Sequence, residues 1–170
     1  MNRNKSKQFR ILAVSLSSRG FGYAVFQGDD WLIDYGKKRI DTDKNVRVLG
    51  HIEKMIASKN PGVMVLQDVN AKGTYRNTRI KQLDRKIIAL AKNRRLKVMK
   101  ISGAELRRLL LGNVTGTKHQ MAELMAKQFP DQLASRLPPK RKPWNSEDIR
   151  MDIFDAVALG VTFNQERGSA

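Results

Sequence analysis

Short apolar runs separated by polar turns dominate the beginning of the chain. The runs at 10–15, 22–26 and 31–36 are mostly branched or aromatic, and the corners between them are rich in Ser, Gly and Asp. Such runs are typical of strands joined by turns. The pattern therefore predicts a three-stranded antiparallel meander over the first 40 residues.

Beyond this meander, helical periodicity alternates with two further strands. Apolar residues recur every three or four positions over 43–58 and 78–93, which predicts two amphipathic helices. The continuous apolar run at 63–66 is typical of a buried parallel strand, and 97–101 is a second short strand. This order predicts an α/β fold whose mixed five-stranded sheet, a meander plus two parallel strands, is flanked by helices.

Capping residues mark three more helices. Ser102 with Glu105, and Thr117 with Gln120, have the spacing of capping boxes. Ser146 is placed to cap a last helix whose first turn holds acidic residues, which complement the helix dipole.

A Pro-rich basic segment, 137–144, precedes the last predicted helix. Its three prolines and three basic residues predict a rigid linker. We expect Trp144 to be a packing anchor, because buried Trp commonly pins irregular segments. The chain is expected to form a single domain over 8–164, with a basic tail at 1–7 and a frayed tail at 165–170.

The charge balance is strongly basic. The 170 residues include 33 Lys and Arg against 16 Asp and Glu, a formal net charge of +17. A field of this sign attracts polyanions, whereas surfaces kept charged for solubility usually intersperse both signs. The composition therefore predicts nucleic acid, DNA or RNA, as the partner.

Basic residues gather on the helix predicted at 78–93, on its flanks and in the linker. Each alone is compatible with a solvated side chain, but together they are suited to tracking phosphates, and one loop tyrosine is placed to stack on an unpaired base. The residues expected to bind nucleic acid are Tyr75, Arg76, Arg79, Arg85, Lys86, Arg107, Arg108, Lys118, Lys140, Arg141 and Lys142.

Two absences restrict the function classes. The chain has no Cys, which excludes disulfides, thiolate catalysis and Cys-ligated metals. No apolar run approaches the roughly 20 residues that a bilayer span needs. We expect a cytoplasmic, nucleoid-associated protein that does not bind membranes.

Three acidic residues near the C-terminus have helical spacing. Asp148, Asp152 and Asp155 are four and three positions apart, which places them on one face of the predicted last helix. Such a row suits a hard divalent cation. Salt bridges to Arg150 and nearby Lys residues are the alternative explanation.

Four segments, in order, resemble RuvC-type Holliday-junction endonucleases of the RNase H-like fold. They are 11–19 followed by Gly22 and Tyr23, then 66–69, 116–120 and 152–159. The resemblance implies a protein of DNA recombination that binds branched or duplex DNA. It also implies a homodimeric endonuclease, because a four-way junction is two-fold symmetric. It also implies hydrolysis by two Mg²⁺ or Mn²⁺ ions that four carboxylates hold, with Lys118 at the entry to a helix near the site.

The resemblance departs from the family at two of the four carboxylates. Ser15 stands where the first-strand Asp is expected and Gln67 where the fourth-strand Glu is expected, while Asp152 and Asp155 keep their places. A hydroxyl and an amide bring no charge to offset two dications. The next residue, Asp68, replaces the lost Glu only if a bulge intervenes, because successive strand residues point to opposite faces.

Two hypotheses follow from this departure. The first is a structure-selective endonuclease whose ligands are Asp152 and Asp155, aided by Asp68 and Asp148. The second is a binding protein without catalysis and without a metal, specific for DNA junctions or RNA. We expect weakened or lost catalysis, and convergence of Ser15 and Gln67 with the two aspartates at one end of the sheet.

Overall fold

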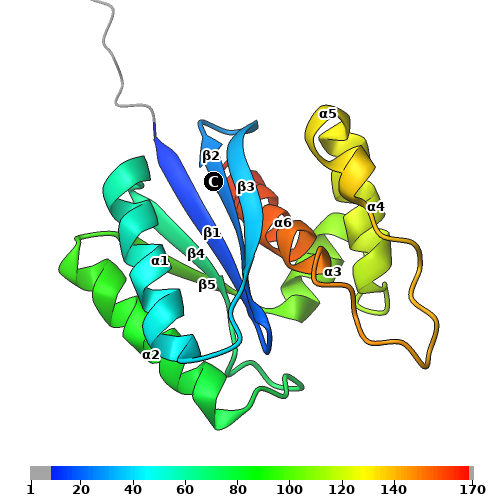
Figure 1. Ribbon diagram of the computed structural model, residues 1–170. Coiled ribbons are helices and arrows are strands. Elements are labelled where there is room, and N and C mark those ends of the chain that lie inside the picture. Colours follow the sequence, from blue (N-terminus) through cyan, green and yellow to red (C-terminus); the bar gives the residue numbers. More distant parts are fainter. Residues whose placement is uncertain (1–8, 169–170) are drawn as a thin grey trace, which may run out of the picture.

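A mixed five-stranded sheet forms the centre of the computed structural model, which describes residues 9–168 (Figure 1). Its strands run in the order β3-β2-β1-β4-β5. β1 pairs antiparallel with β2 and β2 with β3, whereas β1, β4 and β5 are parallel. The predicted meander and the two parallel strands are thus confirmed. The strands are β1 (Arg10–Ser17), β2 (Gly20–Gln27), β3 (Trp31–Arg39), β4 (Val63–Gln67) and β5 (Lys97–Ile101).

Helices cover both faces of the sheet (Figure 1). α1 (Lys44–Lys59) and α2 (Thr78–Asn93) pack on one face. α6 (Met151–Gly168) packs on the other face. The remaining helices lie around α6: α3 (Gly103–Leu111), α4 (Lys118–Gln128), α5 (Pro130–Leu133) and the 3₁₀ turn Ala134–Arg136.

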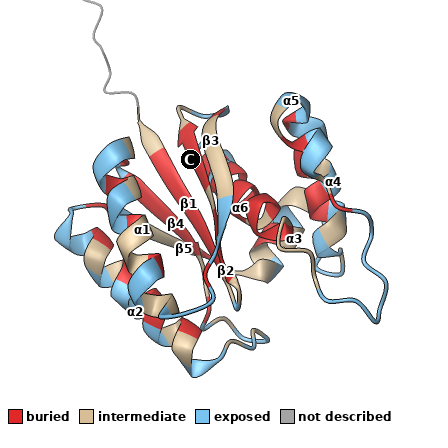
Figure 2. Cartoon of the chain, in the orientation of Figure 1, coloured by how far each residue is buried: buried red, intermediate tan, exposed pale blue. Residues whose placement is uncertain are grey.

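Alternation along β1 divides the core into two layers. Ile11 and Ala13 belong to the apolar cluster that contains α6, whereas Leu12 and Val14 belong to the cluster that contains α1 and α2. All four side chains are fully buried, and Figure 2 shows the central strands and α6 as the buried part of the molecule. A strand covered on both faces needs the continuous apolar run that the sequence has there.

Side-chain caps begin the middle helices where the sequence places them. The side chain of Asn77 accepts a hydrogen bond from the backbone of Ile80 at the start of α2. Thr117 and Gln120 form a complete capping box at α4. These caps satisfy backbone N–H groups that have no partner within the helix. They also fix where α2 and α4 start, beside the end of β1.

Glycine lets the first turn of α6 lie directly against β2. A Cβ atom at Gly22 would lie 2.0 Å from the backbone oxygen of Asp152. Further along, a Cβ at Gly160 would lie 2.2 Å from a ring carbon of Phe26. These close approaches hold Asp152 at the edge of the sheet where β1 ends.

The last helix differs from the expectation at both ends. It begins at Met151 and not after Ser146. The carboxylate of Asp148 accepts hydrogen bonds from the backbone and guanidinium of Arg150, and such local bonds compete with helix formation. The helix then continues to Gly168, so the expected frayed tail is wrong for 165–168, and 169–170 and 1–7 lie outside the described residues.

Pro130 opens α5, where proline suits the first helical position. One smaller expectation fails. Trp144 is no packing anchor, because 76% of it is exposed; the Lys142 ammonium lies over its ring, 5.4 Å from the centroid. Among residues 9–168, no helix has the length and apolar character to cross a membrane.

Candidate functional site

The ends of β1 and β4 bring Ser15 and Gln67 to one edge of the sheet. Ala13 pairs with Val65 and Val14 with Leu66, so continuing this parallel register sets Ser15 beside Gln67. Both share the parity of Ala13 and Val65, whose side chains face α6. Ser15 is buried, with 1% exposed, and Gln67 is half-buried.

Asp152 meets this edge from the first turn of α6. The hydroxyl of Ser17 donates a hydrogen bond of 2.7 Å to its Oδ2 atom. Burial raises the pKa of Asp152, the hydrogen bond from Ser17 opposes this, and the negative charge of Glu147 adds to the rise. A hydroxyl at the end of β1 therefore bonds the aspartate directly, and the charges of Lys118 and Arg19 also oppose the rise in its pKa.

Asp155, one turn further along α6, contacts Lys118 at the start of α4. The Lys118 Nζ atom lies 3.4 Å from Oδ2 of Asp155 and 3.4 Å from Oε1 of Glu147. Burial lowers the pKa of Lys118, but the two carboxylates outweigh it and the net shift is upward.

The pKa of Asp155 also rises, but this rise has the opposite meaning for the ion pair, because a raised pKa disfavours the charged carboxylate. Burial raises the pKa of Asp155 to about 6, and the charges of Glu147 and Asp152 add to the rise against the opposing effect of Lys118. The lysine shift indicates net attraction in the pair, whereas the aspartate shift indicates a disfavoured charge. Burial dominates at the aspartate, because only 15% of its side chain is exposed against 46% for Lys118.

Arg76, in the loop between β4 and α2, bridges the ends of the two parallel strands. Its Nη1 atom donates to the backbone oxygen of Leu16, at 3.0 Å, and its Nη2 atom donates to Oε1 of Gln67, at 3.1 Å. Both acceptors are neutral. The guanidinium charge is therefore placed at the strand ends without a carboxylate partner in these two bonds.

Several of these groups surround one open cavity of about 270 Å³ at the strand ends, which we call the site cavity; Ser15 and Gln67 are not among its lining residues. Three cationic and three acidic side chains face it, together with hydroxyl, amide and aromatic groups. Its lining residues are Leu16, Ser17, Ser18, Arg19, Tyr75, Arg76, Asn77, Ile80, Lys118, Glu147, Asp152 and Asp155.

The residues at the site cavity do not fit a two-metal centre. A pair of Mg²⁺ ions needs several anionic oxygen ligands, and neutral groups stand at Ser15 and Gln67. Lys118 already contacts the Oδ2 atom of Asp155. Among residues 9–168, no three His, Asp or Glu side chains form a group that could hold a metal ion.

The two other candidate ligands lie elsewhere. The carboxylate of Asp68 accepts a hydrogen bond from the backbone of Asn70, and Asp68 does not line the site cavity. Asp148 pairs with Arg150, with 2.7 Å between Oδ2 and Nη2, and lines a second cavity. Placing Asp148 on one helix face with Asp152 and Asp155 is therefore wrong, because it precedes the helix. The alternative explanation, a salt bridge to Arg150, holds for this residue.

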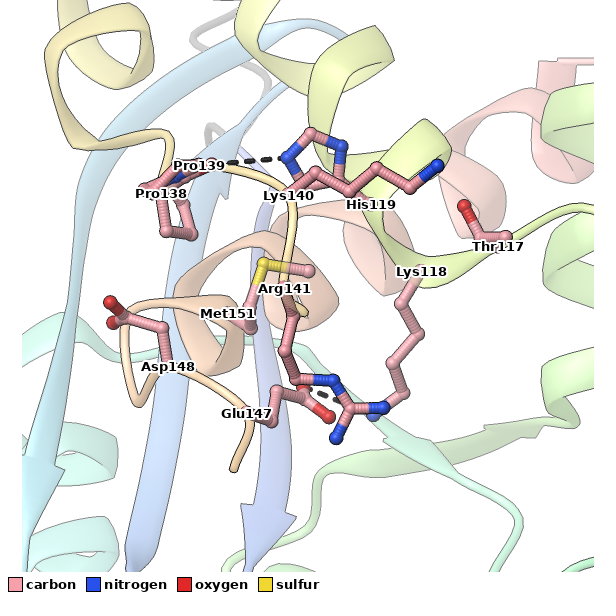
Figure 3. Close-up of a pocket in the computed structure, with 10 residues that line it drawn as sticks. All are labelled: Thr117, Lys118, His119, Pro138, Pro139, Lys140, Arg141, Glu147, Asp148 and Met151. Atoms are coloured by element: carbon pink, nitrogen blue, oxygen red, sulfur yellow. Dashed lines mark hydrogen bonds and ion pairs between the residues drawn. The ribbon is translucent and has the colours of Figure 1, made fainter. Parts of the chain in front are cut away.

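The second cavity, about 290 Å³, lies between α4 and the segment 137–150 (Figure 3). Lys118 and Glu147 line it as well as the site cavity, so their ion pair stands between the two. His119 contacts the carbonyl of Pro138 at 3.0 Å, which ties the segment to α4. Lys140 and Arg141 also line this cavity.

Of the residues predicted to bind nucleic acid, three line the site cavity: Tyr75, Arg76 and Lys118. Tyr75 is 97% exposed. Arg85 and Lys86 are exposed on α2, five and six residues beyond Ile80, and so about 8 Å along the helix from the cavity. The half-buried Arg79 and Arg107 bond to Asn45 and to a backbone oxygen, while Arg108 and residues 140–142 are exposed.

Among the cavity residues that were not predicted candidates, three make contacts across the site: Ser17, Arg19 and Glu147. Ser17 had a usable signal, since it is two residues from Ser15 and shares its face if the strand continues. Arg19 donates to the backbone oxygen of Glu147, a contact between segments far apart in sequence. No local pattern predicts such a contact.

No protein-family model matches this sequence, and no curated protein sequence matches it. Solved structures do match. RuvC of Thermus thermophilus superposes with a TM-score of 0.70 and 10% identity, over 95% of this chain and 97% of that one. The same protein in complex with Holliday junction substrate gives 0.67 and 14%, over 95% and 98%.

A yeast mitochondrial resolvase extends the comparison. The Holliday junction resolvase Ydc2 gives a TM-score of 0.63 with 14% identity, over 95% of this chain and 80% of that one. All these identities are low, so the similarity concerns the path of the backbone. The RNase H-like fold that the resemblance implied is confirmed, and the chain has the fold of RuvC and Ydc2.

Proposed function

We propose that this chain binds branched DNA, with the site cavity facing the backbone at the branch. One observation carries the proposal: cationic side chains and an exposed tyrosine surround the cavity where β1 and β4 end. The net charge of +17 supports contact with a polyanion. A structural neighbour of the same fold is recorded with Holliday junction substrate.

In the proposed function, the protein binds DNA but does not cleave it efficiently. Phosphodiester hydrolysis by the two-metal route needs ligands that hold both ions. At this site Asp152 accepts from Ser17, Asp155 pairs with Lys118, and positions 15 and 67 are neutral. The negative charge left on the carboxylates is too small to hold two dications. We therefore propose that the protein binds junctions but does not cleave them efficiently.

Binding and cleavage of a labelled four-way junction test this proposal together. We expect tighter binding to the junction than to a duplex of the same length or to single-stranded RNA. We expect no more cleavage with 10 mM Mg²⁺ or Mn²⁺ than in buffer. RNA bound more tightly than the junction would refute the DNA assignment. Rapid cleavage abolished by Asp155→Asn would refute the loss of catalysis.

We also propose a homodimer, because two copies related by a two-fold axis match the symmetry of a four-way junction. Analytical ultracentrifugation with and without junction DNA measures this directly. One copy bound per junction at saturation contradicts it.

A further inference from the structure

We propose that Arg76 and Lys118 take the place of metal ions in the site cavity, which binds a phosphodiester group of nucleic acid without a divalent cation. This inference rests on the proposed DNA binding and specifies how the cavity contributes to it. It concerns recognition, and no bond is made or broken.

The position of Arg76 is the first observation. Its guanidinium joins Leu16 at the end of β1 to Gln67 at the end of β4, which are the two strand ends where the resemblance expects carboxylates and a metal. Two of its five N–H groups are used in these bonds. The other N–H groups remain as donors, and they are placed to bind a phosphate oxygen because Arg76 lines the site cavity. Planar guanidinium groups bind phosphate well, in a bidentate manner.

The partner at Gln67 is the second observation. An amide oxygen orients the guanidinium without neutralising its charge, whereas a carboxylate at the same distance of 3.1 Å would form an ion pair. The neutral residue at position 67 is therefore what leaves Arg76 available to an anion. The same neutral residue removes a ligand that a divalent cation requires.

The charge balance of the cavity is the third observation. Arg19, Arg76 and Lys118 face three carboxylates, those of Glu147, Asp152 and Asp155. Lys118 contacts two of these carboxylates, and the third accepts from Ser17. The carboxylates are thus already partnered, so a dication has no excess negative charge to bind. A phosphodiester, with a single negative charge, meets donors that are partly unused.

Metal binding by the free protein is the direct test. We expect no Mn²⁺ binding below 1 mM in titrations followed by electron paramagnetic resonance. The Gln67→Glu variant should also show no Mn²⁺ binding below 1 mM, because the introduced carboxylate pairs with Arg76. Gln67→Glu combined with Arg76→Ala should bind Mn²⁺ at least tenfold more tightly than Gln67→Glu alone. This pair avoids Ser15, where a buried charge would endanger folding. Micromolar Mn²⁺ binding by the unmodified protein, lost in Asp152→Asn, overturns the proposal.

Junction affinity is the second test, measured by fluorescence anisotropy at constant ionic strength. We expect the Kd in EDTA and in Mg²⁺ to agree within twofold. Arg76→Gln should reduce the slope of log affinity against log salt by about 1, as the loss of one phosphate contact predicts. Lys127→Gln, which removes one exposed charge from α4 outside the site cavity, is the control and should leave the slope unchanged.

The outcomes separate the two proposals. If the protein binds no nucleic acid in any buffer, the proposed function fails, and the Mn²⁺ titrations still decide whether the cavity rejects metals. If the junction binds but needs Mg²⁺, or if Arg76→Gln behaves like Lys127→Gln, DNA binding stands and the role of Arg76 is refuted. Circular dichroism melting of each variant checks that it is folded.

Discussion

Asp155 should make the protein less stable as the pH rises, and Asp155→Asn should remove this effect. Its side chain is 15% exposed and faces two other carboxylates besides Lys118. Burial and those carboxylates raise its pKa from 3.8 to about 6. The folded state therefore holds a proton that the unfolded chain releases between these two values.

The pKa shift sets the sign and size of the effect. Stability falls with pH wherever the folded state binds more protons than the unfolded state. The folded protein should thus be free of this penalty below about pH 4, lose stability progressively between about pH 4 and 6, and carry the whole penalty above pH 7. A rise of about 2 pKa units corresponds to about 3 kcal/mol. The gain in stability of Asp155→Asn should be smaller than this penalty, because Lys118 then keeps only Glu147 as a carboxylate partner.

Urea unfolding of the wild type and Asp155→Asn at pH 4.5, 6.0 and 7.5 measures this penalty. The variant should gain about 1 to 3 kcal/mol over the wild type at pH 7.5 and little at pH 4.5. Asp30→Asn, which changes an exposed turn residue, is the control and should show no such trend. A variant that is less stable than the wild type at pH 7.5 would show that attraction to Lys118 outweighs burial. A difference that does not change with pH would refute the raised pKa.

Three further changes test other parts of the structure. Ser17→Ala removes the bond to Asp152 and should cost about 1 to 3 kcal/mol in urea unfolding, and an unchanged midpoint contradicts that bond. Gly22→Ala should cost about 3 kcal/mol or more in thermal melts because its methyl group meets the α6 backbone, whereas Gly50→Ala in α1 has open space and should not destabilise. Neutralising three basic residues of α2 should weaken junction binding and flatten its salt dependence, and an unchanged slope moves the DNA path elsewhere. Those residues are Arg79, Arg85 and Lys86.

The spacing of apolar and capping residues predicted the bounds of those elements whose ends are fixed by hydrogen bonds between residues close in sequence. The bounds of α2 agree with the sequence because an amphipathic stripe and the Asn77 cap both act within a few residues. The start of α6 did not follow its pattern. The bonds between Asp148 and Arg150 span two residues, and they compete with the helix that Ser146 was expected to cap. The sequence contains both the capping signal at Ser146 and the competing pair Asp148 and Arg150. Which of the two determines the start of the helix depends on where α6 packs.

The candidate site was predictable where strand parity alone determines it. Ser15 and Gln67 share a sheet face because side chains alternate along β1 and β4 and the strands are parallel neighbours. Ser17 was missed because β1 was expected to end at Ser15, two residues early. The contact between Lys118 and Glu147 joins residues 29 positions apart. It exists only because the segment 137–150 returns beside α4, and no spacing within either segment records that.

The neutral residue at position 67 and the arginine at position 76 are best understood as one feature. A carboxylate at 67 would hold the Arg76 guanidinium as an ion pair, which would weaken both metal binding and phosphate binding at the strand ends. With an amide at 67, the same 3.1 Å hydrogen bond positions the guanidinium and leaves its charge unneutralised. Restoring carboxylates at Ser15 and Gln67 alone should therefore not restore metal-dependent cleavage, since the guanidinium competes with the cation for the new ligands. Removing Arg76 in the same variant removes that competition. Metal-dependent cleavage by the triple variant, but not by the double variant, would therefore show that the Arg76 guanidinium occupies the place of a cation.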